Sequence, residues 1–106
     1  MHKVEFVGRL AADPTSSEKH SFVANFRVLC KNPKDDQPIG FNVATWGKLG
    51  QACAENLVSG RLVYVEGFLR FNPQTGNPRV YGRADQTVGS AFDVDAYRVD
   101  FLDAKG

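Results

Sequence analysis

Hydrophobic and polar residues alternate along most of this 106-residue sequence, and a period of two is typical of β-strands. Residues that favour turns (Gly, Pro, Asp and Asn) separate the alternating segments. We expect residues 11–20, 31–38 and 72–78 to be loops. A short segment over 79–83 also resumes the strand pattern. The alternation predicts the main strands over residues 4–10, 21–30, 39–46, 61–71 and 90–102.

One segment changes to a helical period. Leu49, Cys53 and Leu57 are four residues apart, so they share one face of an α-helix. Gly60 follows, and glycine is typical of the position that ends a helix. We therefore predict a single helix from about residue 48 to residue 59, with this apolar stripe packed against the sheet.

The predicted elements follow the order strand, strand, strand, helix, strand, strand. This order is typical of the OB-fold, a five-stranded Greek-key barrel with its helix between the third and fourth strands. We predict one OB-fold domain over residues 1–103 and a short C-terminal stub over 104–106. In the last strand the apolar face switches near Tyr97, which predicts a bulge or a bend there.

The third predicted strand separates two aromatic residues. Phe41 shares a face with Val43 and is expected inside the barrel, whereas Ala44 and Trp46 are expected outside. An outward aromatic side chain close to Lys48 can stack on a nucleic-acid base while the lysine contacts a phosphate. The alternative is that Trp46 packs under a loop or against a second subunit.

A second combination of aromatic and basic residues lies near residue 80. Tyr81 is flanked by Arg79 and Arg83, and on a strand these three side chains share a face. The arrangement suits a base held between two cations. It suits equally an exposed loop tip whose charged neighbours keep it soluble.

The outward face of the fourth predicted strand also carries an aromatic residue. Phe68 shares this face with Arg70, opposite the core positions Val63 and Val65. Because an exposed Phe is unusual in a monomer, we expect a ligand or another subunit to cover this face. Phe71, beside the loop over 72–78, fits either side of the strand.

Charge is distributed unevenly, although the formal net charge is only +1. Residues 27–83 contain eight Lys and Arg against four Asp and Glu, whereas residues 84–106 contain two basic and five acidic residues. A basic middle with an acidic end fits an anionic ligand, and it fits equally a solvated surface with scattered charges.

Other classes of function find little support in the sequence. Cys30 and Cys53 fit buried thiols in a reducing compartment better than a disulfide or metal framework. No apolar run approaches the roughly 20 residues that a membrane span needs, and no leader precedes the first strand, so we expect a cytoplasmic protein. His2 and His20 are isolated, and Gly47-Lys48 lacks the rest of a P-loop. We expect neither enzymatic activity nor a cofactor.

Four stretches of the sequence form a pattern that is specific when they are taken together. They are HKVEFVGRLAADP at the start, VANFRV in the second strand, FNVATWGKLGQACAENLVSGRLVYVEGFLR over 41–70, and FDVDAYRVDFL near the end. This pattern, over residues 2–102, resembles the bacterial single-stranded DNA-binding protein family. The resemblance implies an OB-fold, commonly a homotetramer, that coats single-stranded DNA during replication, recombination and repair.

The resemblance also assigns roles to individual residues. Trp46 falls at a base-stacking position and Lys48 at a phosphate-contacting position. Tyr81 falls at a stacking position in the hairpin before the last strand, with Arg79 beside it. The nucleic-acid-binding residues that we predict are Lys3, Arg27, Lys34, Trp46, Lys48, Arg70, Phe71, Arg79, Tyr81 and Arg83.

Two positions depart from the pattern of the family. Lys34 lies in the loop where many members have an aromatic residue, and Gly40 also replaces a common aromatic residue. With fewer stacking residues, we expect an affinity for DNA that depends on charge and falls steeply with salt.

Partners and alternatives stay open at this stage. Family members typically continue into an acidic tail that recruits replication and repair proteins, but this sequence stops at Gly106, so it predicts such partners only if a longer chain carries the tail. A dimer is an alternative to the homotetramer. The alternative functions are an accessory OB-fold module of the replication restart machinery, which contacts proteins, and an RNA-binding OB domain.

Overall fold

The computed structural model describes residues 2–19, 21–34, 36–71, 74–75, 79–82 and 88–102, and for 79–82 and 88–91 we describe the backbone only. In this part of the chain there is one helix, α1 (Gly47–Asn56). The strands are β1 (Val4–Leu10), β2 (Thr15–Ser17), β3 (Val23–Cys30), β4 (Ile39–Trp46), β5 (Leu62–Leu69), β6 (Arg79–Gly82), β7 (Val88–Ala91) and β8 (Asp93–Phe101).

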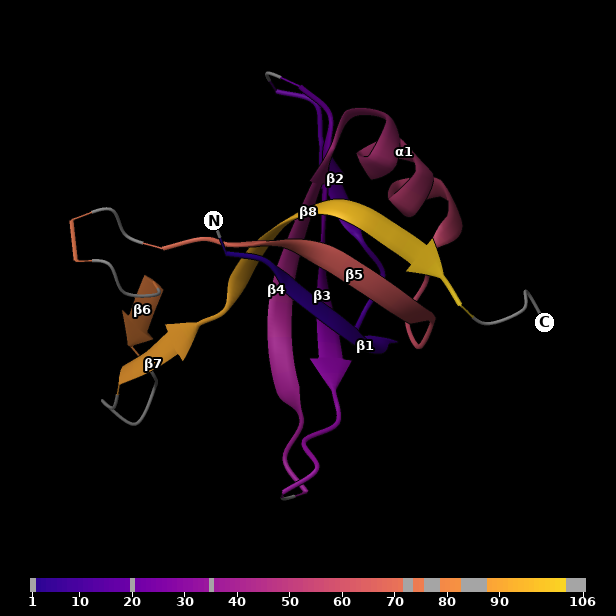
Figure 1. Ribbon diagram of the computed structural model, residues 1–106. Coiled ribbons are helices and arrows are strands. Elements are labelled where there is room, and N and C mark those ends of the chain that lie inside the picture. The colour runs from indigo at the N-terminus through magenta and orange to yellow at the C-terminus, as the bar shows by residue number, and fades with distance from the viewer. Residues whose placement is uncertain are drawn as a thin grey trace.

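Five of the strands close into a barrel (Figure 1). They follow the order β1–β5–β8–β4–β3, and β3 then pairs with β1 through two residue pairs, Arg9 with Leu29 and Leu10 with Val28. All neighbours are antiparallel except β4 and β8, which are parallel. Helix α1 connects β4 to β5 and packs against β3, β4 and β8. The predicted OB-fold is therefore confirmed.

Two predicted segments differ from the structure. The expected loop over 11–20 contains β2, which pairs with β3 and exposes all three of its side chains, so no hydrophobic alternation marks it. The expected last strand over 90–102 is divided at Phe92. The division arises because β7 pairs with β6 in a separate hairpin, whereas β8 pairs with β4 and β5 (Figure 1).

The core forms where the alternating strands turn one face inward. The alternation predicted for these segments is confirmed, because every second side chain in β1, β3 and β5 is buried or partly buried. Burial of this apolar surface is the main term that stabilises a domain of this size. The buried cluster consists of Leu10, Ala24, Phe26, Val28, Cys30, Val43, Cys53, Leu57, Val63, Val65 and Ala96.

Helix α1 buries the predicted stripe but ends earlier than predicted. Cys53 and Leu57 are buried, Leu49 packs against the core, and burial raises the pKa of the Cys53 thiol to about 11. The helix ends at Asn56, because Leu57 is already extended (φ −92°, ψ 142°). Gly60 belongs instead to the turn before β5, where its φ is +85° and its N–H donates to the Leu10 carbonyl at 2.8 Å.

Of the bulge or bend predicted near Tyr97, the structure shows a bulge. Glu66 pairs with Arg98 and Gly67 pairs with Ala96, so Tyr97 is the extra residue of β8. The two strands approach closely here. A Cβ on Gly67 would meet the Asp95 carbonyl oxygen and lie 2.8 Å from the Ala96 Cα, so this position requires glycine. The bulge leaves Tyr97 pointing outward and 48% exposed.

Candidate nucleic-acid interface

Trp46 lies at the junction between β4 and α1. Its backbone is extended (φ −118°, ψ 158°) and pairs with Val23 of β3. The chain then turns into the helix at Gly47, whose φ of +61° favours glycine. As predicted, the tryptophan side chain faces outward and is 43% exposed. A rigid strand and a rigid helix therefore hold an exposed aromatic ring in place.

Arg70, just beyond β5, is brought next to this ring. Its Cζ lies 5.8 Å from the centre of the Trp46 ring, within the range of a cation–π contact. The guanidinium also pairs with the Asp95 carboxylate, with Nε donating to Oδ2 at 3.3 Å. The backbone N–H of Arg70 donates to the Asp93 carbonyl oxygen at 2.7 Å, which fixes the end of β5 beside the start of β8.

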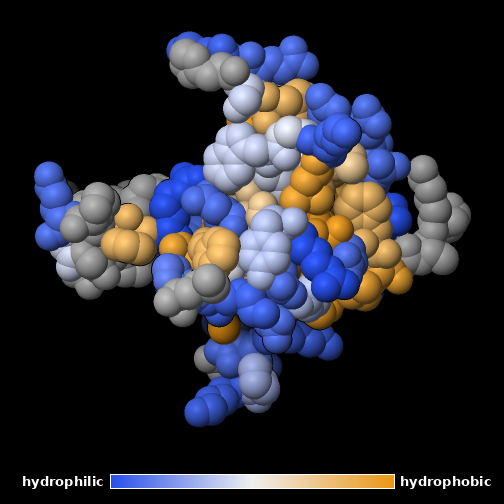
Figure 2. All heavy atoms as spheres, turned by 45° about the horizontal axis from the view of Figure 1, so that its top comes forward, coloured by the Kyte–Doolittle hydropathy of each residue, from blue (hydrophilic) through white to orange (hydrophobic). Residues whose placement is uncertain are grey.

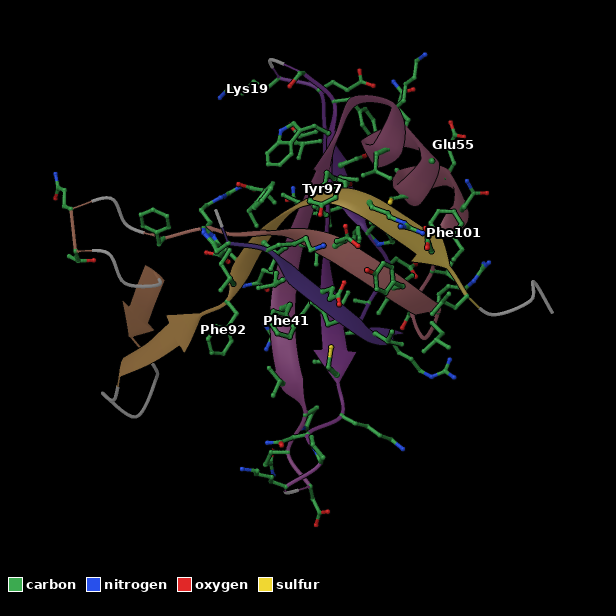
Figure 3. The ribbon with its side chains drawn as sticks, in the orientation of Figure 1. Lys19, Phe41, Glu55, Phe92, Tyr97 and Phe101 are labelled. Atoms are coloured by element: carbon green, nitrogen blue, oxygen red, sulfur yellow. The ribbon has the colours of Figure 1, made fainter. Side chains whose placement is uncertain are left out.

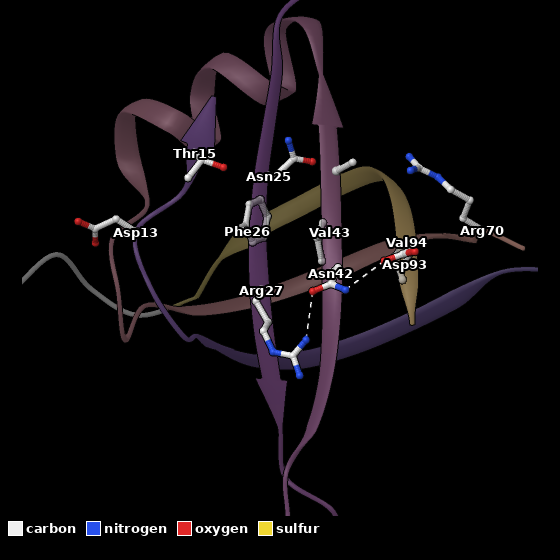
Figure 4. A pocket seen from close by; sticks show the side chains of 11 residues that line it. Asp13, Thr15, Asn25, Phe26, Arg27, Asn42, Val43, Arg70, Asp93 and Val94 are labelled. Carbon is white, nitrogen blue, oxygen red and sulfur yellow. Dashed lines mark hydrogen bonds between the residues drawn. The ribbon is translucent and has the colours of Figure 1, made fainter. Parts of the chain in front are cut away.

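A line of polar side chains crosses the same surface (Figure 4). Arg27 Nη1 donates to Asn42 Oδ1 at 3.1 Å, and Asn42 Nδ2 donates to Asp93 Oδ1 at 3.0 Å. The three residues are neighbours on β3, β4 and β8. A Cβ on Gly40 would collide with the Arg27 guanidinium. The guanidinium can therefore lie here because residue 40 has no side chain.

These residues border a groove of about 370 Å³ that also includes Asn25, Ala44 and Arg70. Ala44 was expected outside, and it does lie on the outward side of β4, but it is only 7% exposed. Its short methyl group lies in the lining of the groove, among longer side chains. The predicted direction of Ala44 is therefore consistent with the structure, although the residue itself is buried.

The other predicted basic residues are spread more widely. Lys48 is exposed in the first turn of α1, which has no acidic residue and no side-chain cap. Lys34 is exposed in the loop after β3, where its N–H donates to Asn32 Oδ1 at 3.1 Å. The Lys3 ammonium lies 3.7 Å from a Glu66 carboxylate oxygen, so Lys3 pairs within the β1–β5 side of the barrel.

Three predicted residues fall in or next to the β6–β7 hairpin. The backbones of Arg79 and Tyr81 lie in β6, where they pair with Ala91 and Gly89 of β7. Their side chains, and Arg83 as a whole, lie outside the described residues. The hairpin leaves the barrel between β5 and β8 (Figure 1).

Aromatic side chains form another feature of the barrel. Phe6 and Phe41 stack with ring centres 4.2 Å apart, and Phe92 lies 5.8 Å beyond Phe41 with 42% of its surface exposed (Figure 3). The Phe71 ring, predicted as a candidate, is exposed and lies 6.2 Å from the His2 ring.

Sequence reasoning missed Asn42, Asp93 and Phe92. Asn42 lies in the same alternating phase of β4 as Ala44 and Trp46, but a lone amide carries no signal of its partners. Asp93 and Phe92 lie at the break between β7 and β8, and the prediction of one continuous strand concealed that break.

The outer surface of β1, β5 and β8 has a different character. The single Tyr64 hydroxyl hydrogen is shared between the carboxylates of Glu5, at 2.8 Å, and Glu66, and Tyr97 donates to Glu66 at 2.5 Å. The hydrogen bonds from Tyr64 and Tyr97 lower the pKa of Glu66, and the bond to Glu66 raises the pKa of Tyr97 to about 12. Figure 2 shows hydrophobic side chains reaching the surface between hydrophilic ones.

Two kinds of feature are absent from the part of the chain that the structure describes. No helix there is long and apolar enough to cross a membrane. No group of three or more His, Cys, Asp or Glu side chains lies close enough together there to hold a metal ion.

A closed OB barrel with an exposed aromatic ring, an arginine against it and a polar groove belongs to a fold class whose members commonly bind oligonucleotides or oligosaccharides. The chain belongs to the single-strand binding protein family, whose model matches residues 1–96. The family resemblance seen in the sequence is therefore confirmed.

Curated relatives agree with this assignment. The chain is 35% identical over 75 residues to a single-stranded DNA-binding protein of Thermosynechococcus vestitus, covering 68% of this chain and 62% of the relative. It is 33% identical over 93 residues to one of Thermotoga maritima, covering 74% of this chain and 64% of the relative. The chain thus spans somewhat less than two thirds of these relatives.

A solved structure agrees with the fold. It is a crystal structure of the mitochondrial single-stranded DNA-binding protein Rim1 from S. cerevisiae. The TM-score is 0.69 at 19% sequence identity, and the match covers 95% of this chain and 94% of the other.

Proposed function

We propose that this protein binds single-stranded DNA without strong sequence preference and coats it during replication, recombination and repair. The observation that carries the proposal is the exposed Trp46 ring, held at a strand–helix junction in contact with Arg70 and two residues before the exposed Lys48. Every base has a flat face, so stacking on such a ring tolerates any sequence. We further propose a binding role without catalysis, in the cytoplasm at the nucleoid.

Phosphate contacts complete the proposed site. Lys48, Arg79 and Arg83 are the main candidates, with Arg27, Lys34 and Lys3 as additional ones, and Tyr81 is the second stacking residue. The start of α1 supports a phosphate near Lys48, because its first N–H groups have no side-chain cap and no acid beside them. Arg70 and Phe71 are the remaining candidates. They follow directly after β5, and Arg70 contacts the Trp46 ring.

The decisive experiment uses Trp46, the only tryptophan, as its own reporter. Oligo(dT) is titrated into the protein at low salt while tryptophan fluorescence is followed, and duplex DNA of the same length serves as the control. Saturable quenching by the single strand alone is the expected result. Absence of binding to either DNA, also by anisotropy of labelled oligonucleotides, would contradict the proposal. Competition with RNA of equal length tests the RNA-binding alternative.

We also propose that the chain self-associates, as a homotetramer or a dimer. Val7, Phe68 and Tyr97 are exposed on the outer surface of β1, β5 and β8 around the Tyr64–Glu66 hydrogen bonds. Exposed apolar side chains that gather on one sheet surface favour burial against another copy. Light scattering coupled to size exclusion measures the mass, and a monomer at micromolar concentration would contradict self-association.

A further inference from the structure

The Trp46 ring does not stand alone at the end of β4. The Arg70 guanidinium lies over it, with Cζ 5.8 Å from the centre of the ring, and the tryptophan is 43% exposed. Figure 4 shows the Arg70 side chain directed from just beyond β5 toward β4. A cation above the face of a tryptophan is attracted by the electrons of that face. Arg70 thus covers part of the ring and supports it from one side.

Asp95 holds this arginine in place. It lies in β8, where it pairs with Ala44 of β4 on one side and with Phe68 of β5 on the other. Its carboxylate accepts hydrogen bonds from two nitrogens of the Arg70 guanidinium, Nη2 and Nε, the second at 3.3 Å. A two-point contact of this kind fixes the orientation of a guanidinium as well as its distance. Asp95 therefore acts on the Trp46 ring through Arg70.

The same contact changes what Arg70 can offer to a phosphate. A phosphate bound to this guanidinium would also lie close to the Asp95 carboxylate, which repels it. Lys48 has a different environment, because the first turn of α1 contains no acidic residue. Of these two basic residues, Lys48 therefore offers its full charge to the backbone of a bound strand, whereas Arg70 does not.

We propose that Asp95 is a positioning residue of the stacking site: it holds Arg70 against the Trp46 ring and withholds the charge of the arginine from the DNA backbone. Arg70 thereby contributes to binding through the ring and not through a phosphate. The inference rests on the proposed function, because it requires that a base of single-stranded DNA stacks on Trp46.

The dependence of affinity on salt tests this division of roles, with anisotropy of labelled oligo(dT) as the measurement. Arg70→Gln should lower the affinity about two- to fivefold, the loss expected for one exposed cation–π contact. It should leave the slope of log affinity against log salt unchanged, because no phosphate contact is lost. Asp95→Ala frees the charge of Arg70 for a phosphate, so the slope should become steeper by about one.

The double variant Asp95→Ala/Arg70→Gln shows whether the steeper slope comes from the arginine. If Asp95 acts through Arg70, removal of both side chains returns the slope to the wild-type value. If the carboxylate only repels DNA, the steeper slope persists in the double variant, and the proposal is overturned.

A second ion pair on β8 supplies the matched control. Arg98 Nη2 lies 3.0 Å from Asp100 Oδ2, and Arg98 Cζ lies 5.5 Å from the centre of the Tyr64 ring. Asp100→Ala therefore also frees an arginine beside an aromatic ring, but at a site that is not among the proposed DNA contacts. Its slope should equal that of the wild-type protein. An equally steep slope in Asp100→Ala and Asp95→Ala would overturn the proposal, because net charge alone would then explain both.

A readout without DNA tests the positioning itself. Acrylamide quenching of fluorescence measures how open the only tryptophan is to collisions in the free protein. Arg70→Gln and Asp95→Ala should both increase the quenching constant of Trp46, whereas Asp100→Ala should not. Melting temperatures show that each variant is folded. A quenching constant unchanged in Asp95→Ala would overturn the positioning role.

The outcomes separate this inference from the proposed function. A slope that falls by one in Arg70→Gln would make Arg70 a phosphate contact, which overturns the inference and leaves single-stranded DNA binding intact. This comparison does not depend on the folding of any Asp95 variant, and Arg70 itself is exposed beyond the end of β5. Absence of oligo(dT) binding by the wild-type protein would overturn both proposals.

Discussion

The exposed ring of Trp46 separates the contribution of one residue to binding from its contribution to folding. We predict that Trp46→Ala weakens binding of single-stranded DNA by about 1–3 kcal/mol, the usual loss for one base–aromatic stack. The melting temperature should change little, because the side chain lies outside the core cluster. Anisotropy of a labelled oligonucleotide and thermal unfolding measure the two effects, and Trp46→Phe is the control that keeps most of the affinity. Unfolding of the alanine variant would place Trp46 in the core.

Alanine substitutions at two glycines form a matched pair, because one should lower stability and the other should lower DNA binding. Gly67→Ala places a methyl group against the backbone of Asp95 and Ala96, so β5 and β8 must separate, at a cost of about 1–3 kcal/mol in the free energy of unfolding. Gly40→Ala meets only the flexible end of Arg27. It should leave stability nearly unchanged but displace the guanidinium and weaken DNA binding. Urea denaturation of both variants measures the difference, and equal stability losses would contradict it.

The sequence did not predict which side chains contact each other across the barrel. Trp46 was predicted outward because alternation in β4 fixes its side. Its contact with Arg70 depends on how β5 is placed relative to the end of β4, and that placement is set by the backbone bond from Arg70 to Asp93. Local periodicity contains no information on such a pairing.

At the scale of elements, the outer surface of β1, β5 and β8 predicts a pH dependence of stability. The hydrogen bonds from Tyr64 and Tyr97 lower the pKa of Glu66 below its ordinary value of 4.5. The stabilisation from Glu66 is therefore present above pH 4.5 and is lost as pH falls through the lowered pKa. The tyrosines have the opposite sign. Their raised pKa values favour the neutral phenols, so their contribution is lost as pH rises from about 10 toward 12.

Unfolding by urea between pH 3 and pH 11, at one protein concentration, tests this expectation. Tyr97→Phe removes one bond to Glu66, so both the acid and the alkaline loss of stability should become smaller than in the wild-type protein. Glu66→Gln should remove the part of the acid loss that belongs to this carboxyl. Identical pH profiles for Tyr97→Phe and the wild-type protein would contradict a role of this hydrogen bond.

The elements themselves were largely predictable, because hydrophobic alternation defines strands whose one face is buried. Alternation identified β1, β3, β4 and β5 within a few residues, and the switch of the apolar face located the bulge at Tyr97. Strand β2 was missed because all of its side chains are exposed. The division between β7 and β8 was missed because it depends on which strand each one pairs with.

For the whole molecule, the proposed mechanism predicts a strong dependence of affinity on salt. Each phosphate neutralised by a Lys or Arg releases counterions, so the logarithm of the binding constant falls linearly with the logarithm of the salt concentration. Lys48→Gln should make this slope smaller by about one. Arg9→Gln, which removes a charge from the exposed side of β1, should not change it. An affinity unaffected by salt would contradict the charge-led mechanism.

Closure of the barrel through β1 and β3 has a consequence for its motions. This pairing has only two residue pairs, and the next backbone bond along it runs from the Ala11 N–H to the Arg27 carbonyl at 2.9 Å. Amide protons at short pairings exchange with solvent through local opening more readily than those of long ladders. The Ala11 amide therefore reports on Arg27, which borders the groove. A ligand that holds Arg27 in place is expected to slow hydrogen exchange at the Ala11 amide.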